Sequence, residues 1–411
     1  MAGAEFDVAI VIPAWNGWEL TEPCLRSIAA HTPGDRYQVV LADNGSTDQT
    51  PTEGIALGAN LFGSRFVHHR LPENLGFATA CNQGAAAASA THLLFLNNDT
   101  VVTENWLPPL LDGLRADPRL AGVGPLLLFP DDNTVRANRV QHLGIAASQN
   151  LEFRHLYEYF PRTHPAVTRR RKLKVITAAA LLMPARLFQA ENGFFEGFRN
   201  GMEDVDLCCR IAARGGHFSV IPESVVHHHT HGTEGRFAHE SENLQLLRTR
   251  CRRPVEDLYD LILEDGFEPG FTPWLDLVVR LPEPQAAELD RRYQADPAPD
   301  RLVRLLDQTP LWDHGHVLLA NHLSERGMHA EAAAAAYFRS LLCPGIRAYE
   351  HCLRTARQAG FHDMARRYGQ TLANLQTALA DQTALANKAR SLAATARHPA
   401  LRAALEEWQA G

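Results

Sequence analysis

Short apolar runs alternate with segments of helical periodicity along the first half of the chain. The segments between the runs repeat apolar residues three or four positions apart, as Leu20, Cys24 and Ile28 do. This alternation predicts strands of a mostly parallel sheet, joined by helices that pack on its faces. The runs that we expect to form strands are 8–12, 37–42, 66–68, 93–96, 123–129, 175–183, 217–221 and 225–226.

Polar residues follow two of these runs directly. Asp43 follows the second run, and Asn97, Asn98 and Asp99 follow the fourth. Ligands of open α/β sheets bind beyond the carboxyl ends of the strands, so we expect these side chains to share one edge. Asp99, beside carboxamides that can hydrogen-bond a ribose, is a candidate for holding a metal-bound diphosphate. The alternative is an ordinary Asn/Asp turn after a strand.

The composition and the missing motifs narrow the class of protein. Hydrophobic residues make up 45% and charged residues 21%, which is typical of a globular protein. The net charge of −7 argues against a general nucleic-acid binder. No G-x-G-x-x-G segment follows the first run and no Walker A sequence occurs, so neither of those nucleotide sites is expected.

The chain also lacks the sequence features of a membrane protein. No apolar run has the length of a membrane span, and Met1–Asp7 does not resemble a signal peptide. The seven cysteines show no C-x-x-C spacing, which favours reduced thiols. We therefore expect a cytoplasmic protein without a transmembrane segment, with peripheral attachment at the inner face of the membrane as an option.

Four blocks of sequence resemble the family 2 glycosyltransferases of the GT-A fold, and most closely their rhamnosyltransferase-type branch. The blocks are Ile12–Asn16 (IPAWN), Ala42–Asp48 (ADNGSTD), Asn74–Phe77 (NLGF) with Asn82, and Leu96–Thr100 (LNNDT). The resemblance implies that Asp43 holds the nucleobase and that Asp99 binds the metal. The triplet here is Asn-Asn-Asp instead of Asp-x-Asp, so Asn97 should contact the ribose more than the metal. The residues that the resemblance assigns to nucleotide-sugar binding are Pro13, Ala14, Asn16, Asp43, Asn74, Gly76, Asn82, Asn97 and Asn98.

A second part of the resemblance covers Asn192–Glu196 (NGFFE) and Gly201–Arg210 (GMEDVDLCCR). Phe195 stands where the family usually has an aspartate. Apolar residues mark one face of a helix after Met202, so Glu203 and Asp204 should lie at a helix N-terminus, where simple capping is the alternative to catalysis. By resemblance Asp204 is the catalytic base, with Glu203 as the second candidate.

Two further polar segments carry chemistry. The cluster His227–His231 follows a predicted strand, and in the family a histidine there completes the metal site; the spacing favours His228, with His229 as the second choice. The basic run Arg169–Lys174 ends a long, aperiodic segment that begins at Asp131. It is either a solvated loop or a clamp over an anionic diphosphate or acceptor.

The last part of the chain changes character. We expect a GT-A domain over residues 1–245, a proline-rich linker with short helices over 246–300, and an α-helical domain over 301–411. A weak repeat relates Gly327–Ala332 to Gly360–Ala365, 33 residues later. This is close to the period of tetratricopeptide-like helix pairs, roughly 34 residues.

The resemblance implies an inverting, metal-dependent transfer of a sugar from a nucleotide-diphosphate donor, UDP- or dTDP-linked, to an acceptor hydroxyl. Mn²⁺ or Mg²⁺ suits oxygen ligands with one imidazole, with a slight preference for Mn²⁺. The acceptor is a glycan, a lipid-linked glycan or a protein, and the helical domain is expected to recruit it or to form a homo-oligomer. Three alternatives remain: a nucleotidyltransferase, a retaining transferase, and a helical-repeat adaptor that carries a weakly active or inactive transferase domain.

Overall fold

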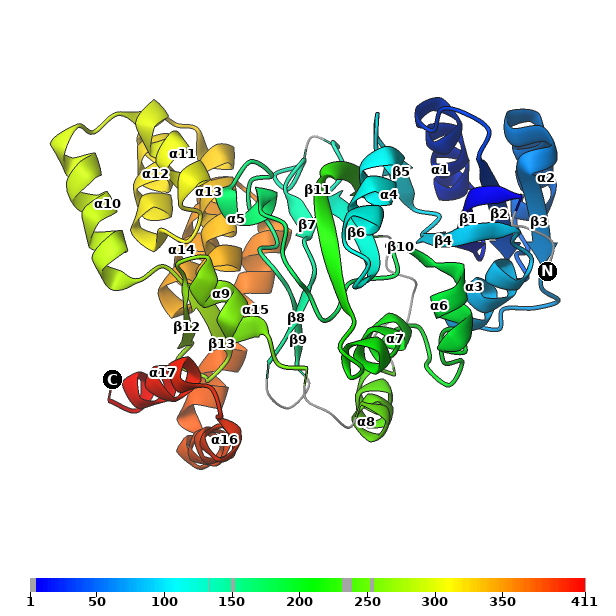
Figure 1. Ribbon diagram of the computed structural model, residues 1–411. Coiled ribbons are helices and arrows are strands. Elements are labelled where there is room, and N and C mark those ends of the chain that lie inside the picture. Colours follow the sequence, from blue (N-terminus) through cyan, green and yellow to red (C-terminus); the bar gives the residue numbers. More distant parts are fainter. Residues whose placement is uncertain (1–4, 133, 149–151, 231–238, 252–254, 411) are drawn as a thin grey trace. The chain divides into compact units, whose positions relative to one another are not determined.

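The protein, examined as a computed structural model, is described for residues 5–132, 134–148, 152–230, 239–251 and 255–410. The chain forms two compact units, shown with their elements in Figure 1. The first unit comprises Met1–Ala147, Leu151–Glu158 and Val167–Val255. The second comprises Ser148–Asn150, Tyr159–Ala166 and Glu256–Gly411.

A mixed sheet of nine strands forms the centre of the first unit among the described residues, in the order β3-β2-β1-β4-β10-β6-β11-β5, with β7 paired to β6. Strands β3, β2, β1 and β4 are parallel, whereas β10 runs antiparallel to β4 and β6, and β5 runs antiparallel to β11. The strands are β1 (Phe6–Ala14), β2 (Tyr37–Asp43), β3 (Phe66–Arg70), β4 (Ala90–Leu96), β5 (Thr100–Val102), β6 (Leu120–Leu128), β7 (Val140–His142), β10 (Ala180–Pro184) and β11 (His217–His228).

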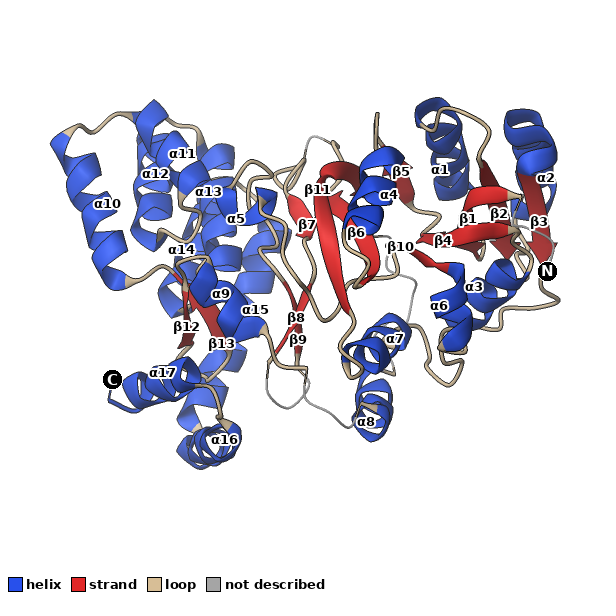
Figure 2. Ribbon diagram, viewed as in Figure 1, coloured by secondary structure: helices blue, strands red, loops and turns tan. Residues whose placement is uncertain are grey.

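Helices cover both faces of this sheet (Figure 2). The helices of the first unit are α1 (Trp18–His31), α2 (Thr50–Phe62), α3 (Phe77–Ala86), α4 (Leu107–Ala116), α6 (Ala185–Ala190), α7 (Glu203–Ala212) and α8 (Glu240–Arg250), with a short 3-10 turn η1 (Gly63–Arg65). A further small hairpin, β8 (Ile145–Ala147) and β9 (Phe153–His155), and the short helix α5 (Pro165–Thr168) lie in the segment that was expected to be aperiodic.

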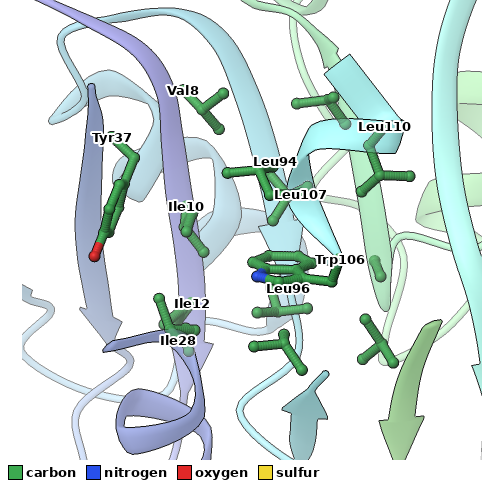
Figure 3. Packing of buried hydrophobic residues seen from close by; sticks show 14 of the residues in the cluster. Val8, Ile10, Ile12, Ile28, Tyr37, Leu94, Leu96, Trp106, Leu107 and Leu110 are labelled. Carbon is green, nitrogen blue, oxygen red and sulfur yellow. The ribbon is translucent and has the colours of Figure 1, made fainter. Parts of the chain in front are cut away.

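Alternating residues of the strands explain why helices are needed on both faces. Ile10 and Ile12 belong to one buried cluster with Ile28 of α1 and Leu110 of α4, as Figure 3 shows. Val11, between them, faces the opposite side, where α3 comes so close that a Cβ at Gly84 would lie 2.6 Å from it. The strands are therefore buried on both faces, which is why their sequences read as continuous apolar runs.

The predicted fold class, a GT-A type α/β domain followed by an all-α region, is confirmed, but several strands differ from the sequence expectation. The run 175–183 becomes a strand only from Ala180. The runs 217–221 and 225–226 form one strand, β11, with a register shift between Ile221 and Val225. Strand β5 was not predicted, because Thr100–Val102 is too short to show a pattern in the sequence.

The second unit is mainly helical. It contains α9 (Leu258–Glu264), the hairpin β12 (Glu268–Phe271) and β13 (Leu277–Arg280), and the helices α10 (Glu283–Ala295), α11 (Pro299–Gln308), α12 (Asp313–Glu325), α13 (His329–Leu342), α14 (Ile346–Gln358), α15 (His362–Ala380), α16 (Gln382–Thr395) and α17 (Pro399–Ala410). The predicted linker 246–300 thus includes a hairpin and helices that cluster with the second unit from Glu256 onwards.

The repeat seen in the sequence corresponds to two helix pairs. Helices α12 and α13 form one pair, and α14 and α15 form the next, with equivalent helices starting 33 residues apart at Asp313 and Ile346. In each pair a glycine with positive φ, Gly327 or Gly360, ends the first helix. The next amide then bonds back to the helix, from Met328 to the Leu323 carbonyl and from Phe361 to the Ala356 carbonyl, each at 2.9 Å. Tetratricopeptide likeness beyond these pairs stays a prediction.

Among the described residues, no helix combines the length and the apolar composition that crossing a bilayer requires.

The two-faced burial of the sheet predicts unequal effects of the same truncation at two isoleucines. Ile10 is fully buried, whereas Ile55 is 47% exposed on α2. Ile10→Ala should lower the free energy of unfolding of the first unit by about 2–5 kcal/mol, because it leaves a cavity. The control Ile55→Ala should change it by about 0.5 kcal/mol or less. Urea titrations of both variants measure the difference, and equal effects would contradict this description of the core.

Candidate functional site

The carboxyl ends of β1, β2 and β4 lie side by side at one edge of the sheet. Strand β1 is the central strand of the three, with Ala14 paired to Asp43 of β2 and Val11 paired to Phe95 of β4. The predicted candidates Pro13, Ala14, Asp43 and the triplet after β4 are thereby brought to the same edge.

Asp43 is fully buried at this edge, and both of its carboxylate oxygens have partners. Oδ1 accepts a hydrogen bond from the Ser46 amide at 2.8 Å, and Oδ2 lies 2.6 Å from Arg70 Nη1 and 3.5 Å from His68 Nε2. Burial opposes ionisation of the carboxyl, but the interactions with His68, Ser46 and Arg70 outweigh it and lower the pKa of Asp43 below its ordinary value. The sequence analysis did not single out Arg70, which lies too far along the chain to be recognised as a partner.

Two loops at this edge are locked together by carboxamide side chains. Asn16 Oδ1 accepts hydrogen bonds from the amides of Thr47 and Asp48 at 2.8 and 3.3 Å. Asn44 joins the loop after β2 to the loop before α3, since it bonds Asn74 Oδ1 at 2.8 Å, the Gly76 carbonyl and the Leu75 amide. Gly45 allows this close approach, because a Cβ there would lie 2.4 Å from the backbone of Glu73.

These contacts give Asn16, Asn74 and Gly76 a structural role. Their predicted role in nucleotide binding stays a prediction. Trp15, which the sequence analysis quoted only as part of a block, is 45% exposed in the same turn. An exposed indole at the end of a strand is a surface on which a planar base can stack.

Asp99 and His228 meet through the short strand β5. His228 of β11 pairs with Thr100 of β5, and the amide of His229 donates to the Asp99 carbonyl at 2.9 Å. This register places His228 Nε2 3.1 Å from Asp99 Oδ1. Neighbouring side chains alternate along a strand, and His227 instead lies with Nδ1 3.1 Å from the Phe129 carbonyl. The structure therefore brings His228 to Asp99 through its side chain and His229 through its backbone; residues 231–238, which contain the end of the histidine cluster, lie outside the described residues.

A third residue, Gln141 of β7, holds His228 and was missed by the sequence analysis. Its Nε2 donates to the His228 carbonyl at 2.7 Å, and its Oε1 lies 2.6 Å from His228 Nδ1. Nothing in the aperiodic segment around Gln141 signals this contact. The neighbouring His142 is buried, and burial, followed by the charges of His155 and His228, lowers its pKa well below the ordinary value.

The two asparagines before Asp99 point to different partners. Asn97 Nδ2 lies 3.4 Å from His228 Nε2, so Asn97 belongs to the Asp99–His228 cluster. Asn98 Nδ2 donates to Thr21 Oγ1 of α1 at 2.8 Å. Asn98 thus anchors the triplet to the first helix.

Asp204 and Glu203 occupy the first turn of α7, as predicted. Asp204 is partly exposed, and it accepts hydrogen bonds from its neighbour Val205 at 2.8 Å and from the Ala178 amide at 3.0 Å. Glu203 is 6% exposed and accepts from the Gly201 amide at 2.8 Å. Met202, with φ of 76°, makes the sharp turn that places both acids at the helix start.

The backbone before β10 connects Asp204 to the triplet. The Asn97 amide donates to the Ala179 carbonyl at 2.9 Å, and the adjacent Ala178 amide donates to Asp204 Oδ2. Asp204 is therefore one peptide unit removed from the partner of Asn97. The edge thus combines a carboxylate–imidazole pair with a partly exposed carboxylate.

Asn82 faces a different part of the first unit. It bonds the backbone of Phe194 in both directions at 2.9 Å and Glu196 Oε1 at 2.9 Å. It helps to line a cavity of about 450 Å³, whose other lining residues are Glu191, Asn192, Gly193, Phe194, Phe195, Glu196, Gly197, Arg210 and Arg250. In this wall Asp206 pairs with Arg210 at 2.9 Å and with Arg250 at 2.7 Å. Phe195, the departure from the family pattern, supports the Arg250 guanidinium, which lies 3.6 Å from its ring centre.

The basic run 169–174 has mixed surroundings. Arg170 pairs with Glu223 at 3.1 Å, and the Arg171 guanidinium lies 5.4 Å from the ring centre of Tyr157. Arg171 is 9% exposed. At least these two cations contribute to local packing, and a role as a clamp stays a prediction.

The Asp99–His228 pair fits a divalent cation in the chemistry of its donors, since one carboxylate and one imidazole are ligands that Mn²⁺ and Mg²⁺ accept. No group of three or more histidine, cysteine, aspartate or glutamate residues with metal-ligand geometry occurs in the part of the chain that the structure describes. The pair would therefore supply two protein ligands.

The ion pair of Asp43 predicts a pH effect on stability. Because the pKa of folded Asp43 lies below that of the unfolded chain, about 3.9, its contribution is present above that value and is lost as the pH falls through the folded pKa. Wild-type protein should therefore lose more free energy of unfolding between pH 6 and pH 3 than Asp43→Asn does. Urea titrations at both pH values test this, and an equal loss in both proteins would contradict the lowered pKa.

Comparison with known proteins identifies the first unit. Residues 9–183 match the family described as Glycosyl transferase family 2. The chain is 29% identical over 230 residues to an N-acetylglucosaminyl-diphospho-decaprenol L-rhamnosyltransferase of Mycobacterium tuberculosis, covering 50% of this chain and 70% of that protein. It is 28% identical over 230 residues to the O-antigen biosynthesis protein RfbC of Myxococcus xanthus, covering 54% of this chain and 17% of that protein.

The solved structure of GalNAc-T7 with UDP, GalNAc and Mn²⁺ aligns with a TM-score of 0.49 and 18% identity, over 60% of this chain and 48% of that one. The chain spans less than half the length of several curated relatives, between 17% and 42% for three of them. From the family match and the relatives together, residues 9–183 are a glycosyl transferase family 2 domain, and the helices α10–α17 follow it in the chain.

Proposed function

We propose that the chain transfers a sugar from a nucleoside-diphosphate donor to an acceptor hydroxyl, with inversion at the anomeric carbon. One observation carries the proposal. A carboxylate–imidazole pair, Asp99 and His228, and a partly exposed carboxylate, Asp204, meet at the carboxyl edge of the sheet. Diphosphate departure and hydroxyl deprotonation require these two kinds of group, and ligands of open α/β sheets bind at this edge.

The nucleoside end of the donor fits the loops after β1 and β2. Asp43 would contact the nucleobase and Asn97 the ribose, while Trp15 offers an exposed ring for stacking. Arg70 faces Asp43 and is itself 42% exposed in its side chain, so it can yield to a ligand. The donor class that we propose is UDP- or dTDP-linked, in line with the rhamnosyltransferase named among the relatives.

A divalent ion, Mn²⁺ or Mg²⁺, would be held by Asp99 and His228 together with the donor diphosphate. When bound, such an ion neutralises the charge that develops on the departing diphosphate. Asn97, next to the pair, would orient the ribose.

Asp204 is our candidate for the general base. Its carboxylate would accept the proton of the acceptor hydroxyl while that oxygen bonds to the anomeric carbon from the face opposite the diphosphate. The bond between the anomeric carbon and the diphosphate oxygen then breaks, and its electron pair leaves with the nucleoside diphosphate. The amides of Ala178 and Val205 hold the Asp204 oxygens, which keeps the carboxylate in place without a neighbouring cation that would make it less basic.

The acceptor is a glycan, a lipid-linked glycan or a protein. The cavity around Asn82 is a candidate for binding acceptor sugar units. Its arginines are already paired with acidic residues, Arg210 and Arg250 with Asp206 and Arg210 also with Glu191. A wall with balanced charge and many hydrogen-bonding groups suits neutral hydroxyls better than a phosphate.

The helix pairs α12–α13 and α14–α15 add a second function to the proposal. Helix-pair arrays present extended surfaces that bind polypeptides or other copies of the chain. All residues proposed for donor binding and proton transfer lie in the first unit. We therefore assign recruitment of the acceptor, or homo-oligomer formation, to the helical unit.

Replacement of the base should separate chemistry from donor binding. Asp204→Asn keeps the shape of the side chain and should lower the transfer rate by about 10²–10⁴-fold, because the hydroxyl proton has no acceptor. Binding of UDP, measured by calorimetry, should stay within about twofold of wild type. Glu203→Gln serves as the control. Near-normal turnover in Asp204→Asn together with loss of turnover in Glu203→Gln would move the role to Glu203.

Donor and metal binding should be coupled through Asp99. A nucleoside-diphosphate sugar with Mn²⁺ should raise the melting temperature more than either alone, because binding to the folded state stabilises it. Screening UDP-, dTDP- and GDP-sugars in this way identifies the donor class. Asp99→Asn should lose the part of the shift that requires Mn²⁺, whereas Asp7→Asn, at the opposite end of β1, should keep it. If the metal-dependent shift survives in Asp99→Asn, the assignment of the ion to this pair is wrong.

A further inference from the structure

The side chain of Gln141 closes a ring of hydrogen bonds with a single residue, His228, by contacting both its carbonyl and its imidazole. We propose that Gln141 is a positioning residue that fixes His228 as the tautomer protonated on Nδ1 and so presents the lone pair of Nε2 to the divalent ion shared with Asp99. This inference rests on the proposed function, which it deepens by explaining how one of the two protein ligands is oriented.

The direction of each hydrogen bond follows from the chemistry of the groups. The His228 carbonyl can only accept, so the group of Gln141 that lies 2.7 Å from it must be the amide nitrogen. The amide oxygen of Gln141 therefore faces the ring, at 2.6 Å from Nδ1. Since this oxygen can only accept, Nδ1 carries the proton, and the neutral ring has its lone pair on Nε2.

The groups around Nε2 agree with this tautomer. Asn97 Nδ2, a donor, lies 3.4 Å from Nε2, and Asp99 Oδ1 lies 3.1 Å from it. A lone pair and a carboxylate oxygen that face each other across this distance repel unless a cation lies with them. The pair is thus oriented as two ligands of one ion, and Gln141 occupies the place that a second partner of a metal-binding histidine commonly takes.

The position of Gln141 in the sheet makes the contact rigid. Its neighbours on β7, Val140 and His142, pair with Leu128 and Leu127 of β6, so the backbone on both sides is fixed. Gln141 is 5% exposed and His228 is 6% exposed, which leaves little room for water to replace the amide. A purely structural clamp would have the same contacts, so the test must follow the tautomer and the metal and not only stability.

The first measurement needs no metal and no donor. In protein labelled with ¹⁵N-histidine, the His228 ring, assigned by its loss in His228→Ala, should show the pattern of the Nδ1-protonated tautomer. Gln141→Met, which keeps the length of the side chain and removes both hydrogen bonds, should show a mixture of tautomers or the Nε2-protonated form. Gln38→Met is the matched control, because Gln38 is also buried and its Oε1 accepts a backbone hydrogen bond, from Ser89 at 3.0 Å. An Nε2-protonated His228 in the wild type would overturn the inference.

The second measurement uses Mn²⁺ and UDP as probes. Electron paramagnetic resonance should detect coupling of Mn²⁺ to an imidazole nitrogen in the wild type and in Gln38→Met. Gln141→Met should weaken Mn²⁺ binding in the presence of UDP by about 10–100-fold and should lose most of the nitrogen coupling. Gln141→Glu keeps an acceptor for Nδ1 and should restore the coupling even if it is less stable. Unchanged Mn²⁺ affinity and coupling in a folded Gln141→Met would overturn the positioning role.

The two measurements separate this inference from the function on which it rests. Absence of nitrogen coupling in the wild type, with the Nδ1-protonated tautomer present, would mean that the proposed metal site fails, and the metal half of the inference with it. The expected tautomer and coupling in the wild type, combined with a Gln141→Met variant that behaves like wild type in both, would leave the proposed function intact and reject Gln141 alone.

Discussion

The pairing of β5 with β11 is the constraint on which the candidate site depends. Thr100 and His228 are 128 residues apart in the chain, and the antiparallel ladder between them brings Asp99 and the imidazole together. A shift of this register by one residue would turn His228 to the other face of the strand and replace it with a neighbour. Three residues of a short edge strand thus decide which histidine meets Asp99.

The remainder of the edge is built so that its polar groups are satisfied by the protein itself. Asn16 and Asn44 bond backbone amides of neighbouring loops, and the amides around α7 hold the Asp204 carboxylate. Asp43 is buried, yet it stays charged because Arg70, His68 and Ser46 surround it. Buried polar networks of this kind are costly when incomplete and rigid when complete. The loops that would receive a nucleotide sugar are therefore preorganised.

The helical unit follows a different logic. Its helix pairs repeat at a fixed spacing, and each turn between helices is closed by a glycine and a backbone bond to the preceding helix. Buried contacts such as that of Arg339 with Asp313, at 2.7 Å, join α13 to α12. Such units grow by stacking and present surface instead of enclosing a pocket. This division of labour is the basis for assigning acceptor recruitment or self-association to it.

The sequence by itself determined the elements and their local signals. The apolar runs predicted β1, β2 and β4, the polar residues after them marked the functional edge, and the glycines at Gly327 and Gly360 revealed the repeat. Only the tertiary structure decided what depends on contacts between distant segments: the antiparallel placement of β10, the existence of β5, and the partners Arg70 and Gln141. Periodicity reports which face of an element is buried, whereas a hydrogen bond between residues far apart in the chain leaves no pattern in either segment.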